Sequence, residues 1–213
     1  MSTKSPNNLP RIVVLVSGGG SNLQAIIDGV ERGQIPATIA AVISNRADAG
    51  GLVRAQHHNI PAEHLDHRQF SDRADFDRAL IQQIDKHSPD LVVLAGFMRI
   101  LSEEFTEHYL GKMLNIHPSL LPKYKGLNTH QRALDNGDKI HGASVHFVTA
   151  ELDGGPIVIQ GKVLIEPEDN KNSLAEKVLQ QEHRIYPLAI AWFVAGRLKM
   201  THGKCELDGN PYP

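Results

Sequence analysis

The chain has 213 residues, of which 41% are hydrophobic and 22% charged, and its formal net charge is -2. This length and balance predict one globular domain over residues 1–213. So small a net charge gives no electrostatic basis for binding nucleic acid or an anionic membrane. The longest apolar run, residues 91–98, is far shorter than the roughly 20 residues that span a bilayer. We therefore expect no nucleic acid and no membrane among its partners.

The N-terminus contains no hydrophobic signal segment, and residues 1–10 are expected to form a disordered lead-in. Cys205 is the single cysteine, which excludes an internal disulfide framework and is typical of a reducing compartment. We interpret Cys205 as a passive thiol near a loose C-terminus. The predicted location is the cytoplasm.

The first elements follow a strand, helix, strand order. Residues 11–16 form a β-branched run that ends in the tight-turn sequence SGGGSN, which predicts a buried strand. Helical spacing of apolar residues follows at Leu23, Ile26, Ile27 and Val30. Residues 38–44 supply the second strand. This order predicts a crossover between parallel strands.

The middle of the chain repeats the alternation. Residues 51–59 fit a short helix, and residues 76–84 fit a longer one that ends before Pro89. The nearly continuous apolar run at 91–96 predicts a strand covered on both faces, and residues 113–116 predict another short strand.

Two more strands, at 144–148 and 157–165, precede a long helix. Ser173 and Glu176 have the spacing of a capping box, so the helix is expected to open there, and Pro187 is expected to kink it. The elements together predict an α/β fold, a Rossmann-like, open, mostly parallel twisted sheet with helices on both faces.

The glycine-rich turn after the first strand can hold phosphate, because glycines expose backbone N–H groups at a helix N-terminus. Gly18 and Gly20 fit a dinucleotide fingerprint, but Leu23 stands where its third glycine belongs. The second strand ends in Ser44-Asn45-Arg46, with no acidic residue there to bind a ribose hydroxyl. A lysine of the P-loop type is also missing. The turn therefore favours a single small phosphate group, with a plain glycine turn as the alternative.

Polar residues collect where the strand at 113–116 ends. Asn115 and His117 are two residues apart, so their side chains can point the same way at the strand's carboxyl end, where open α/β sheets bind ligands. Ser119 lies in no nucleophile-elbow pattern. An amide beside an imidazole suits oxyanion stabilisation and proton transfer. Asp153, in a glycine turn, is the best candidate for a carboxylate that stabilises the charged form of His117.

The runs LNIHPSLLPKYKG and SVHFVTAELDGGPIVIQ resemble the folate-dependent formyltransferases, which share an Asn-x-His and a distant Asp. The opening VLVSGGGSNLQAII is similar to those members whose acceptor is glycinamide ribonucleotide, an intermediate of purine synthesis. DLVVLAGFMRIL and QQEHRIYPLAI extend the resemblance over nearly the whole chain. The resemblance implies the formyltransferase fold and transfer of a formyl group from 10-formyltetrahydrofolate to the amine of that ribonucleotide.

Site residues follow from the same resemblance. It implies three catalytic residues, Asn115, His117 and Asp153. It implies ribonucleotide contacts at Gly20, Ser21, Asn22, Leu179, Gln180, Gln181 and Glu182. It implies folate contacts at Arg73, Met98, Arg99, Ile100, Leu101, Asn115, Thr149, Ala150, Glu151, Leu152 and Asp153. The small-molecule substrates are the implied partners, and a monomer or weak homodimer is expected.

Three further residues or groups qualify this interpretation. Glu182 lies on the apolar stripe of the long helix, where an inward carboxylate needs a polar partner. Asn128 departs from the family, because some relatives carry histidine there. The pairs His57-His58 and His64-x-x-His67 lie in polar segments without a matching third ligand, so no metal is expected.

Four alternatives remain open at this point. A formyltetrahydrofolate hydrolase is expected to carry an extra N-terminal domain, and a methionyl-tRNA formyltransferase an extra C-terminal one. An NADP-dependent oxidoreductase would use Arg46 near the ribose phosphate. A non-catalytic nucleotide-binding module would have no use for Asn115 and His117.

Overall fold

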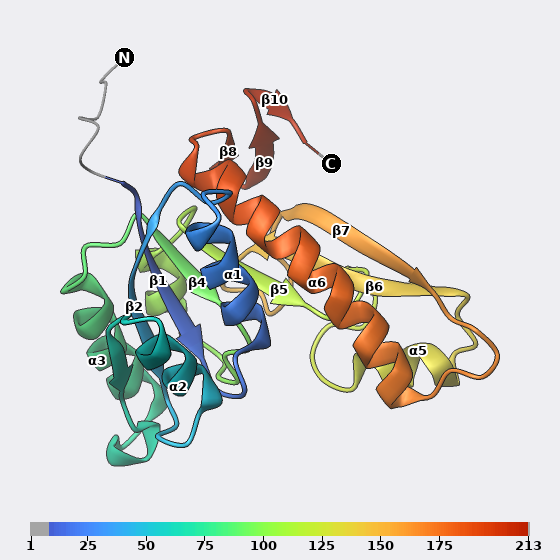
Figure 1. The fold of residues 1–213 in the computed structure, drawn as a ribbon, viewed down its shortest axis with the longest axis horizontal. Coiled ribbons are helices and arrows are strands. Elements are labelled where there is room, and N and C mark those ends of the chain that lie inside the picture. The colour runs from blue at the N-terminus through green and yellow to red at the C-terminus, as the bar shows by residue number, and fades with distance from the viewer. Residues whose placement is uncertain (1–8, 213) are drawn as a thin grey trace.

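The computed structural model describes residues 9–212, and a seven-stranded sheet lies at its centre (Figure 1). The strand order is β3-β2-β1-β4-β5-β6-β7. The strands are β1 (Arg11–Val16), β2 (Thr38–Ser44), β3 (Ala62–His64), β4 (Leu91–Leu94), β5 (Met113–His117), β6 (Ile140–Phe147) and β7 (Ile157–Leu164). The pairs from β3 to β5 are parallel, and β6 and β7 are antiparallel to their neighbours. The predicted mostly parallel α/β sheet is therefore confirmed.

Helices cover both faces of this sheet. The helices are α1 (Ser21–Glu31), α2 (Gly50–His57), α3 (Arg73–Asp85), α4 (Glu103–His108), α5 (Thr129–Asp135) and α6 (Lys171–Val194), with a 3-10 turn η1 (His67–Gln69). Alternate residues of β1 belong to two cores. Ile12, Val14 and Val16 pack with α1, α2 and α6, whereas Val13 and Leu15 pack with α3 and α4. This two-sided burial explains why β1 is apolar at nearly every position.

One part of the sheet has a different cover. Leu114 and Ile116 of β5 belong to the core under α6, so Asn115 and His117 face the other side. Within residues 9–212, the core built on α3 and α4 includes residues of β1, β2, β4 and β5 but none of β6 or β7. The face of the β5–β6 pair that carries Asn115 and His117 is thus covered by loops rather than by these helices.

The long helix begins earlier than the sequence pattern predicts. Asn170 is its N-cap, and the Asn170 side chain accepts from the backbone N–H groups of Asn172 and Ser173. The Ser173 hydroxyl in turn accepts from the backbone N–H of Asn170, at 3.0 Å. Ser173 is therefore the last residue of the capping box, at position N3, and not its first. The helix continues through Pro187 without interruption.

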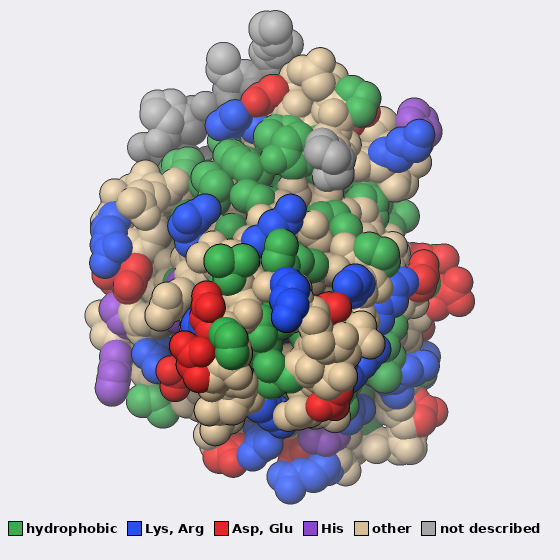
Figure 2. All heavy atoms as spheres, turned by 90° about the vertical axis from the view of Figure 1, so that its right-hand side faces the viewer, with side chains coloured by type: hydrophobic (Ala, Val, Ile, Leu, Met, Phe, Trp, Pro, Cys, Tyr) green, Lys and Arg blue, Asp and Glu red, His purple; other side chains and the backbone are tan. Residues whose placement is uncertain are grey.

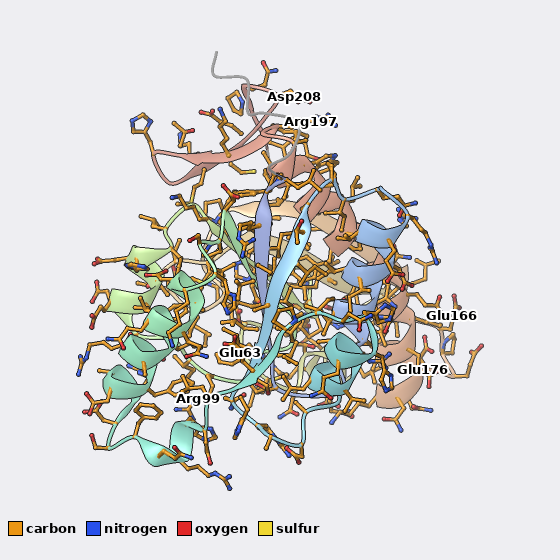
Figure 3. The ribbon with its side chains drawn as sticks, turned by 60° about the vertical axis from the view of Figure 1, so that its left-hand side comes forward. Glu63, Arg99, Glu166, Glu176, Arg197 and Asp208 are labelled. Atoms are coloured by element: carbon orange, nitrogen blue, oxygen red, sulfur yellow. The ribbon has the colours of Figure 1, made fainter. Side chains whose placement is uncertain are left out.

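The expectation of a loose C-terminus is wrong for the described residues. A three-stranded sheet of β8 (Leu198–Thr201), β9 (Lys204–Leu207) and β10 (Asn210–Pro211) follows α6. Cys205 in β9 is 3% exposed, and burial raises the pKa of its thiol to about 11. An Arg197–Asp208 ion pair of 2.7 Å closes the small sheet, at the end of the molecule opposite Arg99 (Figure 3). Of the expected lead-in, residues 1–8 lie outside the described residues.

Candidate active site

The glycine turn begins directly after β1 and ends in the N-cap of α1. Gly20 has φ +73°, and a Cβ atom there would lie 2.7 Å from the Cα of Gly51 at the start of α2. Only glycine suits this conformation and this close approach of two backbones. The first turn of α1 contains no acidic residue, so its backbone N–H groups suit an anion.

The two predicted ribonucleotide-binding stretches lie together at this turn. The Asn22 amide donates from Nδ2 to Oε2 of Glu182 on α6, at 2.7 Å. Glu182 is 7% exposed, and burial raises the pKa of its carboxyl, an effect that the bond from Asn22 partly offsets. The predicted inward orientation of Glu182 is therefore confirmed. Leu179 and Gln181 are half-buried, whereas Gln180 is exposed.

Asn115 and His117 both lie on β5, and each has a direct partner across the antiparallel ladder. Asn115 opposes His146 of β6, and His117 opposes Ser144. The Asn115 Nδ2 atom lies 3.1 Å from Nε2 of His146. Directly opposed side chains share one face of a sheet, so the register places these four residues together.

Asp153 reaches the same place from the turn after β6. Asp153 has φ +50°, a conformation that Asp tolerates better than most residues. Its Oδ2 accepts from the backbone N–H of Gly126 at 2.9 Å and lies 3.5 Å from Nδ1 of His117. Its Oδ1 lies 3.8 Å from Nε2 of His146. The structure thus brings Asn115, His117 and Asp153 into one cluster.

The loop after β5 closes this cluster. Nε2 of His117 lies 2.9 Å from the carbonyl oxygen of Tyr124, so both ring nitrogens of His117 face oxygens that accept. That arrangement suits a doubly protonated imidazolium. The side chains of His117 and Asp153 are each only 8% exposed.

His146 is a site residue that sequence reasoning missed. It is 2% exposed, and burial lowers the pKa of its imidazole, against the opposing effects of its bond to Phe147 and the charge of Asp153. A histidine within an alternating strand is an ambiguous signal. Only the register against Asn115 identifies His146 as part of the cluster.

Three of the predicted folate-contacting residues present large apolar side chains at the surface. Met98 is 71% exposed, and Ile100 and Leu152 are also exposed. Leu101 and Thr149 are half-buried, and Ala150 and Glu151 are exposed. Arg99 lies over the Phe76 ring at 5.5 Å, and Arg73 opens α3 with its side chain exposed.

Two hollows border the glycine turn. One of about 400 Å³ lies between the turn and the loop after β4, and Figure 3 shows Arg99 at this end of the sheet. Its lining residues are Ser17, Gly18, Asn45, Arg46, His67, Gly96, Met98 and Arg99. The Ser17 hydroxyl, which sequence reasoning also missed, accepts from Met98 N–H and donates to Asn45 Oδ1. A groove of about 810 Å³ starts at Ser21 and follows α1 and α6.

Lysine and arginine side chains alternate with acidic ones on the face shown in Figure 2. Within residues 9–212, no group of three or more histidine, cysteine, aspartate or glutamate side chains has an arrangement that could hold a metal ion. Among the same residues, no helix has the length and apolar character needed to cross a membrane.

The sequence is similar to known proteins over almost its entire length. It is 56% identical over 202 residues to the phosphoribosylglycinamide formyltransferase of Escherichia coli (strain K12), which covers 95% of each chain. The solved phosphoribosylglycinamide formyltransferase of Coxiella burnetii, in complex with CHES, superposes with a TM-score of 0.93 at 51% identity and covers 97% of each chain. A formyltetrahydrofolate deformylase of Pseudomonas putida has a TM-score of 0.84 at 30% identity, over 96% of this chain and 72% of its own.

The family profile described as formyl transferase matches residues 10–190. That range includes the glycine turn, the β5–β6 pair, Asp153 and Glu182. The chain belongs to the formyl transferase family.

Proposed function

We propose that the chain transfers the formyl group of 10-formyltetrahydrofolate to the amine of glycinamide ribonucleotide in de novo purine synthesis. The products are the N-formyl ribonucleotide and tetrahydrofolate. The observation that carries this proposal is the cluster of Asn115, His117 and Asp153 at the end of β5. The likeness to the Escherichia coli phosphoribosylglycinamide formyltransferase supports the choice of acceptor.

The acceptor binds between the glycine turn and the cluster. Its phosphate accepts from the backbone N–H groups at Gly20, Ser21 and Asn22, and Glu182 meets a ribose hydroxyl or the amine. β1 and β5 are separated only by β4. Neighbouring strands lie about 4.8 Å apart, so the turn and the cluster are roughly 10 Å apart, a span that suits one small phosphorylated molecule.

The folate binds along the loop after β4 and the loop that carries Asp153. Its ring contacts the exposed apolar side chains of Met98, Ile100 and Leu152, whose burial by a ligand is favourable. The loop 149–153 that lines this surface also carries Asp153. The formyl carbon then lies beside Asn115 and His117.

In the reaction, the neutral amine nitrogen attacks the formyl carbon and a new C–N bond forms. Negative charge develops on the formyl oxygen, where the Asn115 amide and the charged His117 ring donate hydrogen bonds. The bond between the formyl carbon and N10 of the folate then breaks, and N10 receives the proton that the amine loses. Asp153 stabilises the charged His117 and relays that proton through water. His117 Nε2 exchanges its bond to Tyr124 for the substrate oxygen.

A second candidate is hydrolysis of the same folate, because the deformylase of Pseudomonas putida shares this fold. In that reaction water replaces the amine and formate leaves. The glycine turn and the Asn22–Glu182 pair would then have no ligand, which favours the transferase.

Absorbance-monitored loss of the formyl group, with and without glycinamide ribonucleotide, tests the proposal. The transferase should consume 10-formyltetrahydrofolate only when the ribonucleotide is present. Equal consumption in both tubes would identify the hydrolase. No consumption by the folded protein in either tube would exclude formyl transfer.

We further propose that the enzyme acts in the cytoplasm, without a metal, as a monomer or weak homodimer. The buried thiol of Cys205 supports a reducing compartment. Dialysis against a chelator tests the second statement, since an enzyme without a metal should keep its activity. Sedimentation across a range of protein concentrations tests the oligomeric state.

A further inference from the structure

The hydrogen on the His146 ring is placed by its backbone neighbour. Nδ1 of His146 lies 2.8 Å from the carbonyl oxygen of Phe147, an atom that only accepts. Nδ1 therefore carries the hydrogen. In the neutral ring, Nε2 then presents a lone pair and acts as an acceptor.

That acceptor faces the amide of Asn115. The 3.1 Å contact joins Nε2 of His146 to Nδ2 of Asn115, and a lone pair bonds only to the NH2 side of the amide. One N–H of Asn115 is thus held by the ring. Because the amide is planar, the second N–H has a fixed direction away from His146.

The charged groups around His146 decide whether it stays neutral. Asp153, whose Oδ1 lies 3.8 Å from Nε2, favours the charged ring, whereas His117 and Lys125 oppose it. Burial is the largest influence and lowers the pKa of His146. A charged ring would place an N–H at Nε2 and turn the amide oxygen of Asn115 toward itself, so Asn115 would present the wrong atom to an oxyanion.

We infer that His146 is a positioning residue, which acts as a neutral acceptor to orient the Asn115 amide so that its free N–H points at the developing oxyanion. The inference rests on the proposed function, because it gives Asn115 its oxyanion role. The cross-strand register of β5 and β6 provides the alignment. His146 itself contacts Asn115 and not the reacting atoms.

A pair of amide variants separates the two nitrogens of His146. In His146→Gln the side-chain oxygen can occupy the place of Nε2 and accept from Asn115. In His146→Asn the shorter side chain can replace Nδ1 but leaves no acceptor near Asn115. We expect His146→Asn to lower kcat by about 10- to 100-fold, as small misplacements in active sites do, with both KM values within about threefold of wild type. His146→Gln should recover most of this loss.

The matched control is His108→Asn, since His108 lies on α4 with 43% of its side chain exposed and pairs with Asp85. It should keep wild-type kcat. Folded fractions measured by circular dichroism correct each kcat for stability. The pH profile of kcat for His146→Gln should overlay that of wild type, because a neutral His146 does not titrate in the working range.

Each contrary result has a distinct meaning. If wild type is active and His146→Asn is equally active, the inference about His146 is overturned but the proposed function is not. The same holds if both amide variants lose kcat equally. If the kcat of wild type changes with pH in a range where that of His146→Gln does not, His146 titrates and is not the neutral acceptor inferred here. A folded wild type without formyl transfer overturns the proposed function and this inference with it.

Discussion

The two halves of the central sheet present ligand-binding groups in different ways. In the parallel half, β1, β2 and β4 are buried at nearly every position, and the candidate phosphate site consists of backbone groups in the turn after β1. In the antiparallel half, β7 is buried only at Val158 and Gly161, and polar side chains of β5 and β6 form the candidate catalytic cluster. Helix cover explains the difference.

A strand with helices on both faces has no place for a polar side chain except beyond its end. The β5–β6 pair has helix α6 on one face and loops on the other, so Asn115, His117 and His146 can lie within strands. This comparison predicts that changes in the antiparallel half alter the rate of reaction, whereas changes in the parallel half alter acceptor binding and stability.

The largest expected effect is that of His117→Ala. Removing one oxyanion donor should lower kcat by about 100- to 1000-fold, while KM for the ribonucleotide changes little. Steady-state kinetics with both substrates measures this. If His117→Ala keeps the wild-type kcat, His117 has no catalytic role.

The next effect concerns His141 of β6, which is 1% exposed and contacts His130 at 3.2 Å. Burial lowers the pKa of His141 from 6.5 to about 4, so the unfolded chain binds more protons between these values and stability falls as the pH falls. The loss reaches at most about 3 kcal/mol near pH 4. His141→Gln should lose less unfolding free energy than wild type between pH 7 and 4 in urea titrations. Parallel curves for the two proteins would contradict this.

Gly20→Ala tests the backbone site of the parallel half. The side chain would meet Gly51 in a left-handed conformation, so the turn must move, and KM for the ribonucleotide should rise about tenfold or more with a smaller change in kcat. Gly33→Ala is the matched control, because Gly33 has φ +71° and nothing within 4 Å of its added Cβ. Both variants should lose about 1–2 kcal/mol from the left-handed conformation. Only Gly20→Ala should affect KM.

The smallest effect is that of Glu182→Gln. Because burial raises the pKa of Glu182 above its ordinary 4.5, its contribution to stability is present at lower pH and is lost as the pH rises. Glutamine removes that loss, and a gain of about 1 kcal/mol would raise Tm by about 2–4 °C at pH 8. The gain at pH 4 should be close to zero, and an equal gain at both values would contradict the argument. Ribonucleotide affinity should fall.

The sequence could predict those parts of the fold whose signal is local. β1, β2 and β4 are continuous apolar runs, and Glu182 is an obvious polar interruption of a helical stripe. β3 has three residues and α4 six, so neither gives a clear periodic pattern. The start of α6 was misplaced because Ser173 and Glu176 have the same spacing as the true capping pair, Asn170 and Ser173.

The candidate site shows the same limit. Asn115 and His117 are two residues apart in one strand, so their common direction follows from the sequence, and the family resemblance adds Asp153. His146 could not be found in this way, because its place depends on the register between β5 and β6. A shift of one residue in that register would point His146 to the opposite face.

The contact between Gly20 and Gly51 makes two distant positions interdependent. Gly51 also lies against Val16, where its own Cβ would fall 2.9 Å from a Val16 methyl carbon. In a library with random codons at positions 20 and 51, selection for growth without external purines should therefore retain glycine at both. Gly51 contacts no proposed substrate, so its retention would reflect the lack of space for a side chain against Val16.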